Sequence, residues 1–372
     1  MLLALLAPAL AAEVVNTDPA GAFEHFTLDV GGFLQPRFNY VQADEDAGTA
    51  GELGFAVRRA RLEMKGDFSA DTLGLAGQEL ALRYALSVEF MTEAKLQDAY
   101  VELQLAKPLS LRVGQMKTPA SRTYLVSDRN VLFQERPEEI EAFPARDIGV
   151  SVLGFAGKHT LEYQVGLFDG EGTNKAHNEN QSFLTTWRVV ASPMGSPGTK
   201  TELMGIKEDP TFSVGYEGFL NFKGQEGERE ADFEHGAELF GHWRYFTGQG
   251  ELHWEQTDWE DKGVTDFTAL GGYAQGAMFI PAPWMQDHVA LVARYEQVNP
   301  YRPETGDKGL EGATDEHQSH RDITGGIGLY AGEPLFKSVQ TARLVVSYTH
   351  RQELDGFAYD NDEVIATGHL NF

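Results

Sequence analysis

The chain has 372 residues and no cysteine, which excludes a disulfide-stapled scaffold, an iron–sulfur centre and a thiol nucleophile. Hydrophobic residues make up 42% of the chain and aromatic residues 11%, so the chain has enough apolar surface to fold. Its 56 acidic and 30 basic residues give a formal net charge of -26, which argues against nucleic acid as a partner because phosphate contacts require clustered Lys and Arg.

The first segment, residues 1–11, is a run of small and apolar residues that ends in Ala9, Leu10 and Ala11. This pattern is typical of the hydrophobic region and the A-x-A cleavage site of a secretory signal, although the usual positive residues before it are missing. A buried N-terminal helix is the alternative interpretation. We expect 1–11 to be a signal peptide and 12–372 to form a single domain.

No later stretch of 18 residues is continuously apolar, so the sequence predicts no transmembrane helix. Instead, polar and apolar residues alternate. From Leu28 to Tyr40 the even positions are mainly apolar, and the odd positions include Asp29, Gln35 and Arg37. A period of two over thirteen residues indicates a strand longer than those typical of soluble proteins.

About sixteen segments show this pattern, and an even number of strands can alternate up and down. The segments are near 28–40, 59–68, 82–90, 98–105, 109–116, 147–155, 159–168, 183–191, 211–222, 235–246, 249–256, 266–279, 288–298, 322–331, 339–351 and 363–372. The short or weakly charged connections are 70–79, 106–108, 156–158, 192–210, 247–248, 280–287 and 332–338. The connections of the second set are longer and more polar, except for the short 92–97. They are 42–53, 92–97, 117–146, 169–182, 223–234, 257–265, 299–321 and 352–362.

In an up-and-down arrangement the two sets of connections lie at opposite ends. Bacterial outer-membrane barrels have this asymmetry, with short periplasmic turns, long outer loops, and strands that are apolar outward and polar inward. We therefore predict an all-β fold, a transmembrane antiparallel up-and-down β-barrel of about 16 strands, wide enough for an aqueous lumen. Much of the acidity falls in the longer connections, including Asp232 and Glu234 in 223–234.

Aromatic residues near the ends of the outward-facing rows, such as Tyr40, Trp243 and Tyr295, predict girdles at the membrane interfaces. The last segment places Leu370 and Phe372 on its apolar face and ends on the aromatic residue. Such an ending is unusual for a soluble protein. We expect Phe372 to be a membrane-assembly signal.

Several short motifs resemble the phosphate-selective porin O and P family. They are RRARL at 58–62, LRVGQMKTP at 111–119, SDR at 127–129, RDIGV at 146–150 and VGLFDG at 165–170. The resemblance is dense over residues 55–170 and weaker beyond them. It implies a 16-stranded homotrimeric outer-membrane channel whose basic lumen guides anions, with the third long outer loop, here 117–146, folded inward as a constriction.

The predicted lumen carries many basic residues. Strand parity assigns to it Arg59, Arg61, Lys65, Arg83, Arg112, Arg244, Arg294 and Arg343. The constriction loop adds Lys117, Arg122, Arg129, Arg136 and Arg146. Guanidinium groups bind phosphate and carboxylate bidentately, so these residues are candidates to line the pore and bind anions. In the alternative, they pair with Glu63, Asp67, Glu89, Asp98 and Glu102 on neighbouring strands and stiffen the wall.

We expect an integral porin of the bacterial outer membrane, surrounded by lipid, that passes small anions such as phosphate or small hydrophilic solutes by passive diffusion. No nucleophile motif or metal-ligand spacing is found, so no enzymatic activity, cofactor or metal is expected. Two alternatives are a general or cation-preferring porin, which the net charge favours, and a secreted soluble β-rich binding protein.

Overall fold

The computed structural model describes residues 25–44, 51–70, 80–106, 108–138, 143–223, 230–259, 267–299, 319–331, 342–354 and 360–372. The predicted signal peptide, 1–11, lies outside the described residues. None of the helices in the described ranges is long and apolar enough to span a membrane.

The secondary structure of the described residues is almost entirely β. Its elements are β1 His25–Phe26, β2 Asp29–Val41, β3 Glu52–Ala70, β4 Leu80–Glu89, β5 Lys95–Ala106, β6 Leu109–Lys117, α1 Arg122–Leu125, β7 Arg146–Ala156, β8 Leu161–Phe168, β9 Leu184–Ala191, β10 Lys207–Lys223, β11 Glu230–Arg244, β12 Phe246–Trp259, β13 Phe267–Phe279, β14 Val289–Asn299, β15 His320–Ala331, β16 Ala342–Glu353 and β17 Glu363–Asn371.

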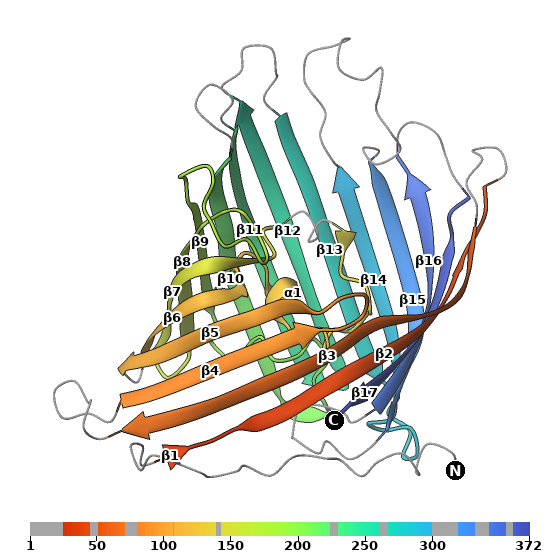
Figure 1. The fold of residues 1–372 in the computed structure, drawn as a ribbon. Coiled ribbons are helices and arrows are strands. Elements are labelled where there is room, and N and C mark those ends of the chain that lie inside the picture. Colours follow the sequence, from red (N-terminus) through yellow and green to blue (C-terminus); the bar gives the residue numbers. More distant parts are fainter. Residues whose placement is uncertain are drawn as a thin grey trace.

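The strands close into a barrel (Figure 1). Each strand from β2 to β17 pairs antiparallel with the next, and β17 pairs with β2 to close the cylinder. The short β1 adds a pairing to β3 outside this ladder. The prediction of an up-and-down barrel of sixteen strands is confirmed, because β2 to β17 correspond one by one to the sixteen alternating segments.

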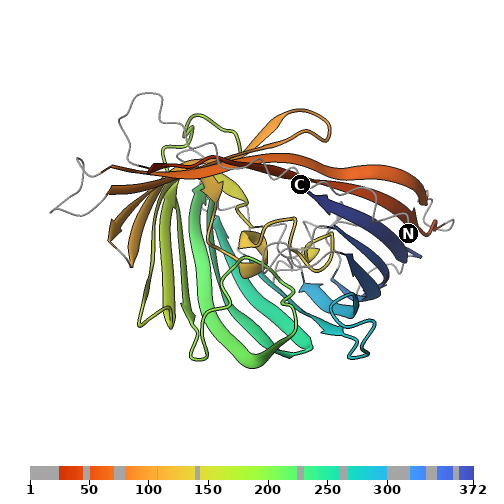
Figure 2. The same ribbon diagram turned by 90° about the horizontal axis from the view of Figure 1, so that it is seen from below.

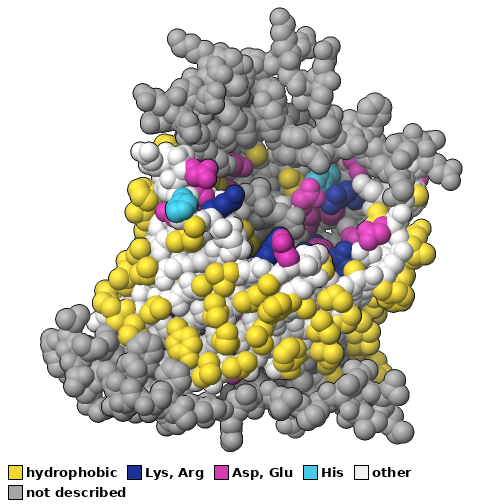
Figure 3. All heavy atoms as spheres, in the orientation of Figure 1, with side chains coloured by type: hydrophobic (Ala, Val, Ile, Leu, Met, Phe, Trp, Pro, Cys, Tyr) yellow, Lys and Arg dark blue, Asp and Glu magenta, His cyan; other side chains and the backbone are white. Residues whose placement is uncertain are grey.

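Side chains alternate across the barrel wall as the pattern predicts. In β14, Val292 and Glu296 face inward and are buried, whereas Leu291 and Tyr295 are exposed on the outside. Figure 3 shows hydrophobic side chains covering the outer wall, with charged side chains visible in the opening above it. An outer surface of this kind matches a lipid environment.

Two boundaries differ from the prediction. The connection between β11 and β12 is a tight turn at Arg244 and Tyr245, not at 247–248, and Trp243 pairs with Phe246. Arg244 has a positive φ of 53° in this turn, and its guanidinium lies over the Trp243 ring. The expected lumenal position of Arg244 is therefore wrong. The glycine at 248 suggested a turn, but a glycine is also tolerated within a ladder.

The second difference is at the start of β11, which begins at Glu230 within the expected outer loop 223–234. Asp232 and Glu234 lie in this strand and are buried on its inner face. The acidity at this position belongs to the barrel wall, because the strand extends further than its alternating apolar residues suggested.

The connection between β6 and β7 folds into the barrel (Figure 2). Its side chains build apolar clusters against the inner wall, since Ala120 and Phe143 pack with Phe219 and Tyr273. Further along the same loop, Leu132 and Phe133 pack with wall residues of β13, β14 and β16. The interior of the barrel is thus partly filled by its own loop.

Candidate functional site

The loop inside the barrel, residues 117–146, is attached to the wall of β3 through Asp128. Arg61 Nη1 lies 2.7 Å from Asp128 Oδ2, Arg59 Nε lies 3.6 Å from the same oxygen, and Arg136 pairs with the other oxygen. Burial favours the neutral carboxyl, but Arg136, Arg59 and Arg61 outweigh it and hold the pKa of Asp128 well below its usual range. Asp128 is therefore a charged anchor.

A second anchor forms at Glu135, where the guanidinium of Arg58 donates two hydrogen bonds of 2.8 Å. Arg37 also pairs with this carboxylate. Burial tends to raise the pKa of Glu135, but the hydrogen bonds and charge of Arg58 and the charge of Arg37 lower it below the usual value. Wall arginines thus bind the loop at two points seven residues apart.

Strand parity alone does not place Arg58 in the lumen. In the ladder between β2 and β3, Gln35 pairs with Arg59 and Pro36 pairs with Val57, so Arg58 is the extra residue of a β-bulge. The bulge turns two consecutive arginines toward the loop. Pro36 within a strand was the available signal, because proline has no amide hydrogen for the ladder.

Helix α1 carries the loop across the barrel to the wall of β12. Ser121 Oγ accepts a hydrogen bond from the Tyr124 amide, which caps the helix. The Thr123 amide donates to Glu251 at 2.7 Å. Arg122 is buried over the Phe240 ring and donates to the carbonyl of Gly198 at 2.7 Å, so it fastens the loop on the far side of the barrel.

A second segment enters the interior from the opposite end. The connection between β9 and β10, which contains most of the predicted connection 192–210 from the short or weakly charged set, places buried Glu202 against the loop. The Glu202 carboxylate accepts from the Leu132 amide at 2.6 Å, and the Glu202 amide donates to Asn130 O at 3.1 Å. Its polar partners on the wall include Gln275, at 2.8 Å. The two connections together narrow the lumen.

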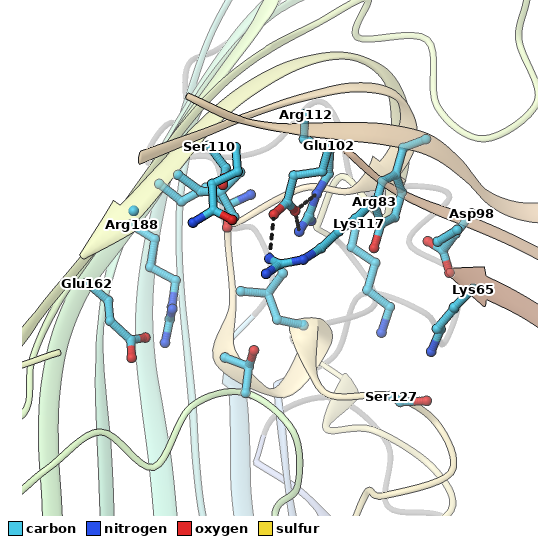
Figure 4. A pocket seen from close by; sticks show the side chains of 18 of the residues that line it. Lys65, Arg83, Asp98, Glu102, Ser110, Arg112, Lys117, Ser127, Glu162 and Arg188 are labelled. Carbon is cyan, nitrogen blue, oxygen red and sulfur yellow. Dashed lines mark hydrogen bonds and ion pairs between the residues drawn. The ribbon is translucent and has the colours of Figure 1, made fainter. Parts of the chain in front are cut away.

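Open space remains between the loop and the wall formed by β3 to β8 (Figure 4). A cavity of about 610 Å³ lies on the side of the short turns, and a second of about 470 Å³ lies on the side of Met91 and Gln97. Both cavities are lined by Arg61 and Arg146, so they meet at these two side chains. This wall offers a route past the loop.

The route is positively charged even though the chain is acidic. The larger cavity is lined by seven Lys or Arg and four carboxylates, a net charge of +3. The second is lined by five Arg and two carboxylates, again +3. A third cavity of about 400 Å³, on the wall of β14 to β17, is lined by four Arg and five carboxylates and is slightly negative. Positive charge thus gathers on one side of the barrel.

The wall arginines also form ion pairs with neighbouring strands. Glu102 lies between Arg83 and Arg112, at 3.2 and 2.7 Å (Figure 4). Arg146 pairs with Asp98 at 3.0 Å, and Arg61 also pairs with Glu89. These contacts match the alternative in which cross-strand pairs stiffen the wall. The two roles coexist, because basic groups still outnumber carboxylates along the route.

The candidate residues of the sequence analysis fall into two groups. Lys65 and Arg83 are 58% and 59% exposed to the lumen, and Arg112 is partly exposed. Lys117 Nζ instead donates to the carbonyls of Tyr124 and Val126, at 2.6 and 2.8 Å. The other residues that hold the loop are Arg122, Arg129 on Glu63, Arg136, Arg294 on the Glu135 carbonyl and Arg343 on the Val131 carbonyl.

Residues 31–211 match the model of the family Phosphate-selective porin O and P. No curated protein matches the chain. The barrel is similar to the anion-selective porin from Comamonas acidovorans, with a TM-score of 0.66, 12% identity, and coverage of 93% of this chain and 100% of that one.

Two further solved barrels are similar. OmpT of Vibrio cholerae, in its trimer form, has a TM-score of 0.63 and 11% identity, over 93% of this chain and 99% of that one. The outer membrane channel DcaP of Acinetobacter baumannii has a TM-score of 0.58 and 13% identity, over 93% and 97%. At these identities the likeness establishes the fold.

Proposed function

Because residues 31–211 match the phosphate-selective porin O and P family and the chain is an integral outer-membrane porin, we propose that it conducts small anions along the wall of β3 to β8. The observation that carries this proposal is the net charge of +3 on each of the two cavities beside the loop. In a narrow passage of low dielectric, such a charge attracts anions more strongly than it does in bulk water.

The order of the basic groups suits stepwise passage. An anion that enters on the side of Arg58 reaches Arg61 and Arg146 where the cavities meet, and then Arg83 and Lys65. Each guanidinium already shares a carboxylate, so each site is weak. Conduction requires several weak sites of this kind, because a single strong site would retain the ion.

The proposal includes the assembly and the type of activity. One similar barrel, the Vibrio cholerae OmpT, has a trimer form, and we propose a homotrimer for this chain as well. Outer-membrane lipid surrounds its apolar wall, and solutes cross by passive diffusion without a catalytic step. The similar porin of Comamonas acidovorans is anion-selective, which supports the same preference here.

Reversal potentials in a planar bilayer with a KCl gradient test this proposal. We expect a sign that reports preference for chloride, and added phosphate should reduce the chloride current. Arg83→Gln should shift the reversal potential toward cations, by an amount that shrinks at high salt because of screening. Arg321→Gln removes the same charge from an exposed pair between Arg321 of β15 and Gln352 of β16, and this variant is the control. Cation preference of the unmodified channel would overturn the proposal.

A further inference from the structure

Next to Arg188, which lines the larger cavity, the inner wall of β10, β11 and β12 carries a buried cluster of acidic residues and one histidine. Ligand atoms of Glu217, Glu251 and His253 all lie within 4.8 Å of one another. His253 Nε2 is 3.3 Å from Glu251 Oε2 and 3.9 Å from Glu217 Oε1. Ligands around a tetrahedral zinc ion, each about 2.0–2.2 Å from the metal, are separated by roughly 3.4 Å. The three side chains are thus close to such a geometry.

Glu217 is the member of the cluster that most needs a partner. Its side chain is 0% exposed, and neither carboxylate oxygen accepts a hydrogen bond from any donor in the described part of the chain. The nearest cation, Arg188, lies 3.5 Å away and gives two hydrogen bonds of 2.7 Å to Glu238 instead. Glu238 and Glu251 both repel the Glu217 charge. A buried carboxylate in this position requires a compensating cation or a proton.

The His253 ring lies between two carboxylates. Its Nδ1 lies 3.0 Å from Glu234 Oε1, a contact in which the ring nitrogen is the donor. Its Nε2 lies 3.3 Å from Glu251 Oε2, a hydrogen bond in which the ring is again the donor, so without a metal the ring carries a proton on each nitrogen. A metal ion bound here would take the place of the Nε2 proton, because histidine binds metals through a deprotonated ring nitrogen. A carboxylate on the second nitrogen is also how metal-bound histidines are commonly oriented.

The backbone leaves room for this arrangement. Gly236 of β11 pairs with both Glu217 and His253 in the two adjoining ladders. A Cβ at this position would come within 2.4 Å of His253 Nδ1, so a glycine is needed for the ring to lie against β11. The Phe143 ring of the loop covers the imidazole, with ring centroids 4.6 Å apart. The cluster is therefore enclosed as well as close in space.

We propose that Glu217, Glu251 and His253 form a binding site for a divalent transition-metal ion of the zinc class. The two carboxylates and one imidazole nitrogen are donors that zinc accepts, with water as a fourth ligand, whereas calcium takes six to eight oxygens. Glu251 also accepts hydrogen bonds from the Thr123 amide and the Tyr273 hydroxyl, at 2.7 and 2.6 Å. The metal would therefore brace the loop from the wall opposite Asp128.

The test uses the full-length protein in detergent, stripped with EDTA and titrated with Zn²⁺ and then with Co²⁺. We expect one ion per chain, a melting temperature that rises until this ratio is reached, and visible absorption bands of tetrahedral Co²⁺. Glu217→Gln and His253→Gln should abolish binding, and Glu234→Gln should weaken it by roughly 10–100-fold. Glu296→Gln, at another buried inward carboxylate, should bind as the unmodified protein does.

Zinc-edge X-ray absorption of the unmodified protein decides the matter even if a variant fails to fold. A spectrum with one nitrogen and carboxylate oxygens around the ion supports the site. No stoichiometric uptake by the unmodified protein, or equal uptake by folded His253→Gln, would overturn it and leave a cluster neutralised by protons. Ion selectivity is measured separately, so failure here is distinguishable from failure of the anion route.

Discussion

Arg61 Nη1 lies 2.7 Å from Asp128 Oδ2, and this contact joins the barrel wall at β3 to the loop inside the lumen. Both side chains are almost completely buried, and Arg59 and Arg136 face the same carboxylate. Asp128 therefore contacts three guanidinium groups and fixes the position of the loop against the wall. Removal of the Asp128 charge would leave the three positive guanidinium groups close together with no carboxylate between them.

We predict that Asp128→Asn destabilises the protein by about 3 kcal/mol, because removal of one partner of a buried ion pair leaves uncompensated charge. The loop should also become less firmly held, which raises single-channel conductance and its fluctuations. Denaturant unfolding and bilayer recordings measure the two effects. Asp287→Asn removes a carboxylate at an exposed position and should change neither. A variant with unchanged stability would show that the loop is held mainly by its apolar side chains.

The same anchor predicts a dependence on pH. The folded-state pKa of Asp128 is well below the ordinary value, and the pKa of Glu135 is also lowered. A lowered pKa stabilises the folded loop fully above the unfolded value of about 4, and this stabilisation is lost as pH falls through the lowered folded value. Conductance should therefore stay constant from pH 7 to about 4 and change below it. Recordings in which Asp128→Asn shows the same acid transition would contradict this assignment.

The face assignment predicts a contrast between two positions of β6. Val113 is 49% exposed on the outer wall, and Ser110 lines the larger cavity. Val113→Arg should cost about 2–4 kcal/mol, as charged residues do at the middle of the lipid-facing wall. Ser110→Arg should cost much less, because the lumen is wet. The yield of heat-modifiable, membrane-inserted barrel is measured for each variant. Equal yields of Val113→Arg and Ser110→Arg would mean that the two faces of β6 have been assigned wrongly.

The C-terminal residue takes part in closing the barrel. The Gly32 amide donates to the Phe372 carbonyl at 2.7 Å, and the Phe372 amide donates to the Gly32 carbonyl at 3.0 Å. Deletion of Phe372 removes both bonds from the seam between β17 and β2, so we expect slower or less complete insertion into vesicles. Phe372→Trp keeps the backbone bonds and an aromatic ring and should insert almost normally. Normal insertion of the deletion variant would refute this role.

Sequence alone was sufficient for the fold. A membrane barrel places every second side chain in lipid, so the alternation in segments such as 28–40 and 288–298 predicts strand number, direction and facing without any tertiary information. It also placed Lys65, Arg83 and Arg112 on the lumenal face. It failed at Arg244 and at the start of β11, where turn and strand ends depend on local pairing.

Tertiary structure decided what the lumenal residues contact. Alternation gives a side chain its face but not its neighbours, which depend on ladder register and on how loops fold back. The bulge opposite Pro36 turns Arg58 inward beside Arg59. The pairing of β9 with β10 brings Arg188, which lines the same cavity as Arg83, to 3.5 Å from Glu217. Glu217 and His253 are 36 positions apart in sequence, and only the pairing of β10 with β11 and of β11 with β12 brings them together.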